Sequence, residues 1–228
     1  ETVARNWRME FSDTCPFTGL LSWSPDGKMI ASIETNLLTL RDASNMLVLN
    51  VFSNLKGVDR IQWSSDSKYI LCATYETGVV QVWSVEDPTW FCKINEGPAG
   101  LAFSRWAPDA RSILNTNDFN VRISVWTLCS DSGSIAGLHP PKFSEQGLDF
   151  SADGRFLAVA ERRDCKDHIR VYDTATWSAV NRFAVETGDL VDLKWAPDDS
   201  FIGVWDSPLE YLFLAYSPDG RAIGRYKA

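Results

Sequence analysis

The stretch AERRDCKDHI, at positions 160 to 169, concentrates more side chains capable of chemistry than any other run of the sequence. It holds both types of carboxylate, three basic residues, Cys165 and one of only two histidines, His168. A cysteine flanked by Arg and Lys could act as a nucleophile, because nearby positive charge favours the thiolate. The other histidine, His139, lies far away in the sequence, and Cys165 with His168 lacks the second pair of ligands that a zinc site would need. What this stretch does therefore depends on the elements that position it.

The composition limits the classes of protein to consider. The chain has 228 residues, of which 45% are hydrophobic and 23% charged, and its apolar runs fall short of the roughly 18 to 20 residues of a membrane span. Its formal net charge of -8 argues against binding driven by nucleic-acid phosphates. Five scattered cysteines predict reduced thiols and a cytoplasmic or nuclear location. We therefore expect neither a membrane anchor nor direct nucleic-acid binding.

A repeat organises the chain. Five stretches share an aromatic residue followed by two small residues or Pro, then Asp, a polar turn and an apolar run: LSWSPDGKMIAS (21–32), IQWSSDSKYILCA (61–73), SRWAPDARSILN (104–115), LDFSADGRFLAVA (148–160) and LKWAPDDSFIGVW (193–205). The anchor aromatics are Trp23, Trp63, Trp106, Phe150 and Trp195, which lie 40, 43, 44 and 45 residues apart. A period of about 40 to 45 residues is typical of the four-stranded blades of a β-propeller.

The segments between the anchors have the pattern of β-strands. About 20 residues after each anchor comes an alternating apolar strand: 37–42, 79–84, 122–127, 169–174 and 212–217. The sequence therefore predicts an all-β WD-repeat propeller with about five four-stranded blades, at roughly 9–53, 54–95, 96–140, 141–184 and 185–228, after a leader or unrelated segment at 1–8. Because a blade buries its faces only against its neighbours, five blades suggest part of a larger ring.

Several phrases are more specific than the repeat. Five stretches resemble the WD-repeat family of centrosomes and spindle poles that is named from a gene lying antisense to a tumour-suppressor relative. They are MEFSDTCPFTGLLSWSPDGKMIAS (9–32), ILCATYETGVVQVWSVEDPTWFCKINEGPAGLA (70–102, which includes EGPAGL), ILNTNDFNVRISVWTLC (113–129), AERRDCKD (160–167) and WAPDDSFIGVWDSPLEY (195–211). The resemblance implies the amino-terminal part of a scaffold. It implies partnership with a coiled-coil protein of microtubule anchoring and centriolar satellites, and in fungi with a minus-end-directed kinesin.

Two other functions compete with the scaffold. An enzyme is disfavoured because the sequence lacks a G-x-S-x-G elbow, a Gly-rich phosphate loop and an H-E-x-x-H motif, and we expect no cofactor or metal. A propeller like those of translation initiation factors, binding ribosome or RNA, is the alternative. The blades also lack the Gly-His dipeptide of ordinary WD repeats, so we do not expect the usual buried network of His, Ser or Thr, Asp and Trp, and we expect their stability to depend more on packing.

The repeat register predicts that residues 161–168 form a loop between the second and third strands of the fourth blade. Two interpretations of its charges stay open: ion pairing with neighbouring acidic loops, or binding of a partner through Arg, which is common at interface hot spots. Trp90 and Trp177, near outermost strands, are further contact candidates, whereas the anchor aromatics should be core. The candidate partner-binding residues are Glu161, Arg162, Arg163, Asp164, Lys166, Asp167, Trp90 and Trp177.

Overall fold

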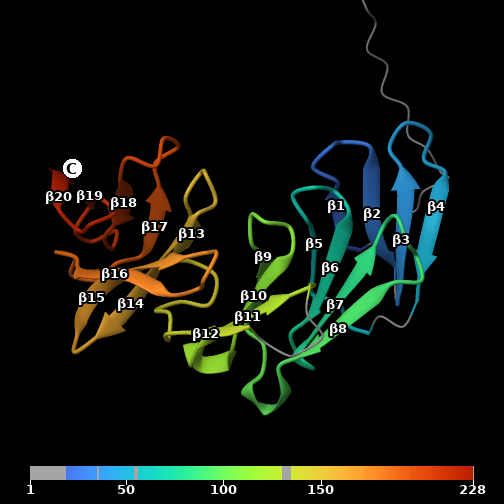
Figure 1. Cartoon of the computed structure of the whole chain (residues 1–228), viewed down its shortest axis with the longest axis horizontal. Helices are drawn as coiled ribbons and strands as arrows, with labels where there is room; N and C mark the ends of the chain where they lie inside the picture. The colour runs from blue at the N-terminus through green and yellow to red at the C-terminus, as the bar shows by residue number, and fades with distance from the viewer. Residues whose placement is uncertain (1–18, 35, 54–55, 130–134, 228) are drawn as a thin grey trace, which may run out of the picture.

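The computed structural model describes residues 19–34, 36–53, 56–129 and 135–227, and it contains five four-stranded antiparallel sheets. In each sheet the strands pair in chain order. The sheets follow one another in an arc, with the first and the fifth at its opposite ends (Figure 1). The predicted all-β propeller architecture with five blades is confirmed.

We number the sheets as blades one to five. Blade one contains β1 (Leu21–Trp23), β2 (Met29–Glu34), β3 (Leu37–Asp42) and β4 (Val48–Phe52). Blade two contains β5 (Arg60–Trp63), β6 (Tyr69–Thr74), β7 (Val79–Ser84) and β8 (Phe91–Asn95). Blade three contains β9 (Phe103–Trp106), β10 (Ser112–Thr116), β11 (Ile123–Thr127) and β12 (Ala136–Leu138).

Blade four contains β13 (Leu148–Phe150), β14 (Phe156–Arg163), β15 (Lys166–Asp173) and β16 (Ala179–Ala184). Blade five contains β17 (Asp192–Trp195), β18 (Ile202–Trp205), β19 (Leu212–Tyr216) and β20 (Ala222–Lys227). Two short 3-10 turns lie on connections, η1 (Gly97–Ala99) and η2 (Asp118–Asn120). Within the described residues, no helix is long and apolar enough to cross a membrane.

The apolar cores lie between the blades. Four clusters of buried side chains fill the spaces between blades one and two, two and three, three and four, and four and five. Since a middle blade has a partner on each side, both of its faces are buried, and its strands carry apolar residues on both. This arrangement explains the repeat, because every blade must supply the same packing positions.

The anchor tryptophans tie successive blades together. The indole N–H of Trp63 donates to the carbonyl of Ser22 at 3.1 Å, and that of Trp106 donates to the carbonyl of Gln62 at 3.2 Å. Trp63, Trp106 and Trp195 are buried, and Phe150 is half-buried. Trp23 differs from the expectation, since 55% of it is exposed. The reason is geometric: burial of an anchor needs a preceding blade, and Trp23 stands in the first described sheet.

The connections fall on two rims. The turn rim carries the connections between first and second strands and between third and fourth strands, including the Asp-containing turns of the repeat. The loop rim carries the connections between second and third strands and those that lead to the next blade.

Candidate partner-binding site

The charged stretch is a tight hairpin on the loop rim. β14 runs on to Arg163 and β15 begins at Lys166, so only Asp164 and Cys165 remain as the turn. Both turn residues have left-handed backbones, with φ of 51° and 60°, as a two-residue turn that matches strand twist requires. The predicted loop at 161–168 is therefore wrong. The strands continue because Glu161 and Asp167 point inward and find partners there.

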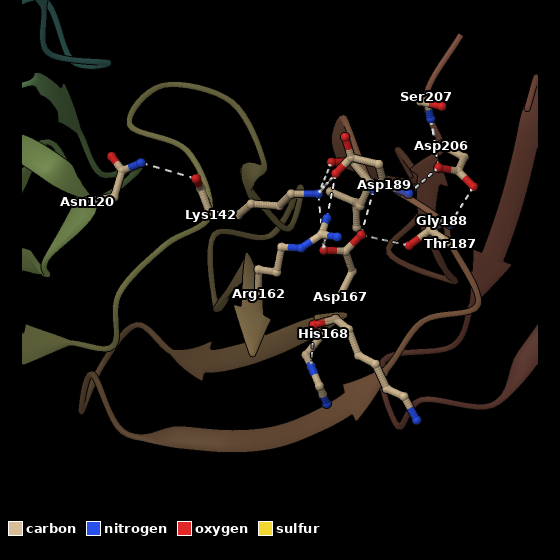
Figure 2. Close-up of polar contacts among 12 residues, drawn as sticks. Asn120, Lys142, Arg162, Asp167, His168, Thr187, Gly188, Asp189, Asp206 and Ser207 are labelled. Atoms are coloured by element: carbon tan, nitrogen blue, oxygen red, sulfur yellow. Dashed lines mark hydrogen bonds and ion pairs between the residues drawn. The ribbon is translucent and has the colours of Figure 1, made fainter. Parts of the chain in front are cut away.

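Asp167 is the centre of a buried cluster of charges. It is 2% exposed and lies 3.1 Å from the Nζ atom of Lys142, whose side chain is 8% exposed. Its Oδ2 also accepts hydrogen bonds from the backbone N–H of Leu190 at 2.7 Å and from the hydroxyl of Thr187 at 3.2 Å. Figure 2 shows these groups converging between the hairpin and the connection that leads to blade five. Asp167 therefore joins three segments of the chain.

Asp189 extends this cluster toward the surface. Its Oδ1 accepts hydrogen bonds from Lys142 Nζ at 2.7 Å and from an Arg162 guanidinium N–H at 2.6 Å. The hydrogen bond and charge of Lys142, with a smaller contribution from Arg162, hold the pKa of Asp189 below its usual value of 3.8. Arg162 also lies 3.5 Å from Asp167. Arg162 therefore spans the border between the buried cluster and solvent.

Hydrogen bonds continue from the cluster to the blades on either side. The Asn120 side-chain amide of blade three donates to the carbonyl of Lys142 at 3.1 Å. On the other side, Asp206 of blade five accepts hydrogen bonds from the backbone N–H groups of Gly188 and Asp189, each at 2.8 Å (Figure 2). Burial alone would raise the pKa of Asp206, but backbone N–H donors outweigh it and lower the pKa. One network thus fixes the loop rim across blades three, four and five.

Glu161 is held in a second, separate cluster. It is 6% exposed, and its carboxylate pairs with Arg170 at 2.5 Å and with Arg182 at 3.4 Å. Arg170 and Arg182 belong to the two strands that follow in the same sheet. Glu161 therefore crosslinks its own blade and presents little surface to a partner.

The structure divides the predicted contact residues into three groups. Arg163, Asp164 and Lys166 are exposed at the hairpin tip. Glu161, Arg162 and Asp167 belong to the ion-pair networks.

Trp90 and Trp177 lie away from the hairpin, in the turns that precede β8 and β16 on the turn rim. Trp90 is half-buried with its ring 5.4 Å from that of Tyr69, and Trp177 is only 8% exposed. Trp177 therefore offers little surface to a partner, contrary to its choice as a contact candidate, because its ring packs in the core between blades three and four.

The metal interpretation finds no geometric support in the described part of the chain. His168 Nδ1 lies 3.1 Å from the carbonyl of Lys166. Among the described residues, no group of three or more His, Cys, Asp or Glu side chains is placed to hold a metal ion.

Blade three contains a buried polar network that the sequence pattern did not predict. The carboxylate of Glu96 accepts hydrogen bonds at 2.6 to 3.2 Å from four side-chain donors: Asn115, Asn117, Ser124 and Trp126. Glu96 opens the EGPAGL phrase on which the family resemblance partly depends. Blade three therefore has a buried polar network around Glu96 although the sequence lacks the Gly-His dipeptide. This network corrects the expectation that, in this blade, stability depends more on packing than on buried polar groups. The EGPAGL phrase was the feature of the sequence that could have indicated a special role for Glu96.

Comparison with known proteins agrees with this architecture. The chain is 46% identical over 221 residues, 96% of its length, to WD repeat-containing protein WRAP73 of Mus musculus. Together with five sheets built on one repeated motif, this similarity decides the class of protein. The chain is a WD-repeat protein. The similarity supports a place in the WRAP73 family, and the chain spans 47% of that relative's length.

More distant similarities agree with the fold. The chain is 21% identical over 148 residues to a component of eukaryotic translation initiation factor 3 from Aedes aegypti, covering 64% of this chain and 20% of that protein. Two solved structures share the fold at 15% identity. They are the Kuenenia stuttgartiensis hydrazine synthase (TM-score 0.60, covering 96% of this chain and 70% of that one) and the mitotic checkpoint complex (TM-score 0.64, covering 91% and 66%). No family model matches the sequence.

Proposed function

We propose that this protein is a non-catalytic scaffold at the centrosome or spindle pole. In this role it binds a coiled-coil anchoring protein of the kind found at centriolar satellites, helps to anchor microtubule minus ends and takes part in spindle assembly. A minus-end-directed kinesin is a further candidate partner, and the location is the cytoplasm and its cytoskeleton. Support comes from the family-specific phrases and from the similarity to a WD-repeat relative over nearly the whole chain.

One observation about the site carries the proposal. The hairpin of blade four is anchored by the buried Asp167 cluster, yet its tip displays Arg163 and Lys166 to solvent. Lys166 makes no ion pair with the described residues, and the nearest carboxylate to Arg163 is its neighbour Asp164, at 3.7 Å. A rigid support that holds exposed basic side chains outward suits a contact with an acidic surface, because little order has to be gained on binding.

The direct experiment uses the full-length protein and the purified coiled-coil anchoring protein. The double variant Arg163→Ser with Lys166→Ser should weaken binding about tenfold while leaving thermal unfolding unchanged, because neither side chain is buried. The matched control is Lys28→Ser with Arg221→Ser, which removes the same charges from the turn rim at side chains that are 80% and 85% exposed. Equal binding by the two double variants would count against the hairpin as the contact.

The alternative is a role like that of the distant initiation-factor relative. It is favoured only by 21% identity over part of the chain. Such a role predicts RNA binding that weakens steeply with salt. Filter binding with the full-length protein tests it, and tight, salt-sensitive RNA binding would replace the scaffold proposal.

A further inference from the structure

Two apolar side chains project from the loop rim on either side of the hairpin. Phe119 is 96% exposed and Leu209 is 92% exposed, the highest values among the large hydrophobic residues that the structure describes. Val121 and Tyr211 beside them are 60% and 65% exposed. All four lie on connections between second and third strands, in blades three and five. We call Phe119, Val121, Leu209 and Tyr211, together with Arg163 and Lys166 of blade four, the rim patch.

The backbone at both aromatic residues is unusual. Phe119 has φ of 59° and ψ of 16°, and Tyr211 has φ of 47°. Bulky residues seldom adopt this left-handed conformation, because Cβ then crowds the following carbonyl. Neither ring is buried, so core packing does not compensate the strain. Backbone strain that no buried contact compensates is an indication of function.

The surrounding loops hold these residues in place. The turn at Phe119 is closed by a hydrogen bond from the Asn120 N–H to the carbonyl of Asn117 at 3.2 Å. The turn at Tyr211 is closed by its own N–H, which donates to the carbonyl of Ser207 at 3.3 Å. Both turns are also joined to the central network, the first through Asn120 and Lys142 and the second through Asp206 (Figure 2). The two loops that carry the apolar tips and the hairpin of blade four are therefore joined by one network.

The charges of this surface favour an acidic ligand. Between the apolar tips stand Arg163 and Lys166, and Arg122 lies next to Val121 without a carboxylate at ion-pair distance in the described structure. Among the exposed carboxylates nearby, Glu210 pairs with Lys227 at 3.0 Å and Asp164 lies 3.7 Å from Arg163, whereas Asp118, beside Phe119, makes no ion pair with the described residues. Lys166 and Arg122 are therefore the basic side chains without a carboxylate partner on this surface. In a chain of net charge -8, such a basic area is locally distinct.

We propose that the rim patch docks an acidic amphipathic helix of the partner protein, with apolar residues on Phe119 and Leu209 and carboxylates on Lys166 and Arg163. This proposal rests on the proposed scaffold function and names its contact surface. A helix suits the site better than an added strand, because the rim patch consists of turns, and strand addition needs a sheet edge. A lipid surface would meet the same apolar and basic side chains, and the vesicle assay described below tests it.

The strain at Phe119 allows a clean test in the full-length protein. Phe119→Asn removes the ring and places a residue that tolerates the left-handed region, so the thermal midpoint should stay the same or rise. Affinity for the purified coiled-coil anchoring protein should fall about tenfold. Met46→Asn is the matched control, since Met46 also has a left-handed backbone, with φ of 60°, and is 39% exposed on the turn rim. Binding by that variant should be unchanged.

Overlapping peptides of the anchoring protein identify the ligand chemistry. The expected binders are acidic and become helical on binding, and Phe119→Asn and Leu209→Ser should each weaken them. Wild-type affinity of Phe119→Asn, or peptides that bind in basic or extended form, would overturn the proposal. Capture of the protein by anionic phospholipid vesicles that is lost in Phe119→Asn would assign the rim patch to a membrane instead.

The outcomes separate this proposal from the scaffold function. If the anchoring protein binds and only the Arg163 and Lys166 double variant loses affinity, the scaffold function stands and the helix-docking proposal falls. If the unaltered protein does not bind the anchoring protein at all, both proposals fall.

Discussion

The two rims of the arc are stabilised in different ways. On the turn rim a local motif recurs, in which a serine hydroxyl donates to the aspartate two residues later: Ser24 to Asp26, Ser64 to Asp66, Ser151 to Asp153 and Ser217 to Asp219. On the loop rim blades three, four and five differ, with Glu96 central in blade three, Asp167 in blade four and Asp206 in blade five. The repeated rim encodes the propeller, whereas the variable rim gives this protein its own surface.

The largest expected effect is at the centre of the loop rim. Asp167→Asn should destabilise the fold by about 3 kcal/mol, because it leaves the buried ammonium of Lys142 without one of its two carboxylates. Asp164→Asn, three residues away and 91% exposed, is the matched control and should change stability little. Urea unfolding of both variants measures the difference. Equal stability would show that the loop rim does not depend on the Asp167 cluster.

A smaller effect is expected on the turn rim, and it should depend on pH. The hydroxyl of Ser151 and the backbone N–H of Arg155 hold the pKa of Asp153 below its usual value of 3.8. Because the folded pKa is the lower one, this stabilisation is present above the unfolded pKa and is lost as pH falls through the folded pKa. Thermal midpoints should therefore fall as pH drops below about 4. Ser151→Ala should make this decline shallower, and an unchanged slope would exclude Asp153 as a source of it.

The smallest effect concerns two exposed cysteines on opposite rims. Cys165 is at the hairpin tip of the loop rim, whereas Cys129 follows β11 on the turn rim. Binding of the anchoring protein should slow thiol labelling of Cys165 and leave that of Cys129 unchanged. Cys72 is an internal reference, because burial raises its pKa to about 12 and the native protein should leave it unlabelled. Mass spectrometry of labelled peptides separates the three sites.

The sequence predicted the parts of the molecule that repeat. The anchor spacing gave the five blades, and the third strand of blade two was placed at its observed bounds, 79–84. The extension of the β14–β15 hairpin could not be predicted from the local sequence pattern. Its charged residues Glu161 and Asp167 are accommodated in strands because they pair with residues distant in the sequence, such as Arg182 and Lys142. The exposure of Trp23 was not predicted for a related reason, since an anchor residue in a propeller is buried by the preceding blade and not by its own.

The most direct test of the division between the rims is hydrogen exchange of the full-length protein with and without the coiled-coil anchoring protein. Complex formation should slow hydrogen exchange of the backbone amides at 117–122, 163–166 and 206–211. Amides of the Ser-Asp turns at 24–28, 64–68, 151–155 and 217–221 should exchange unchanged. Protection confined to the turn rim, or to the outermost strands β4 and β16, would contradict the assignment of partner binding to the loop rim.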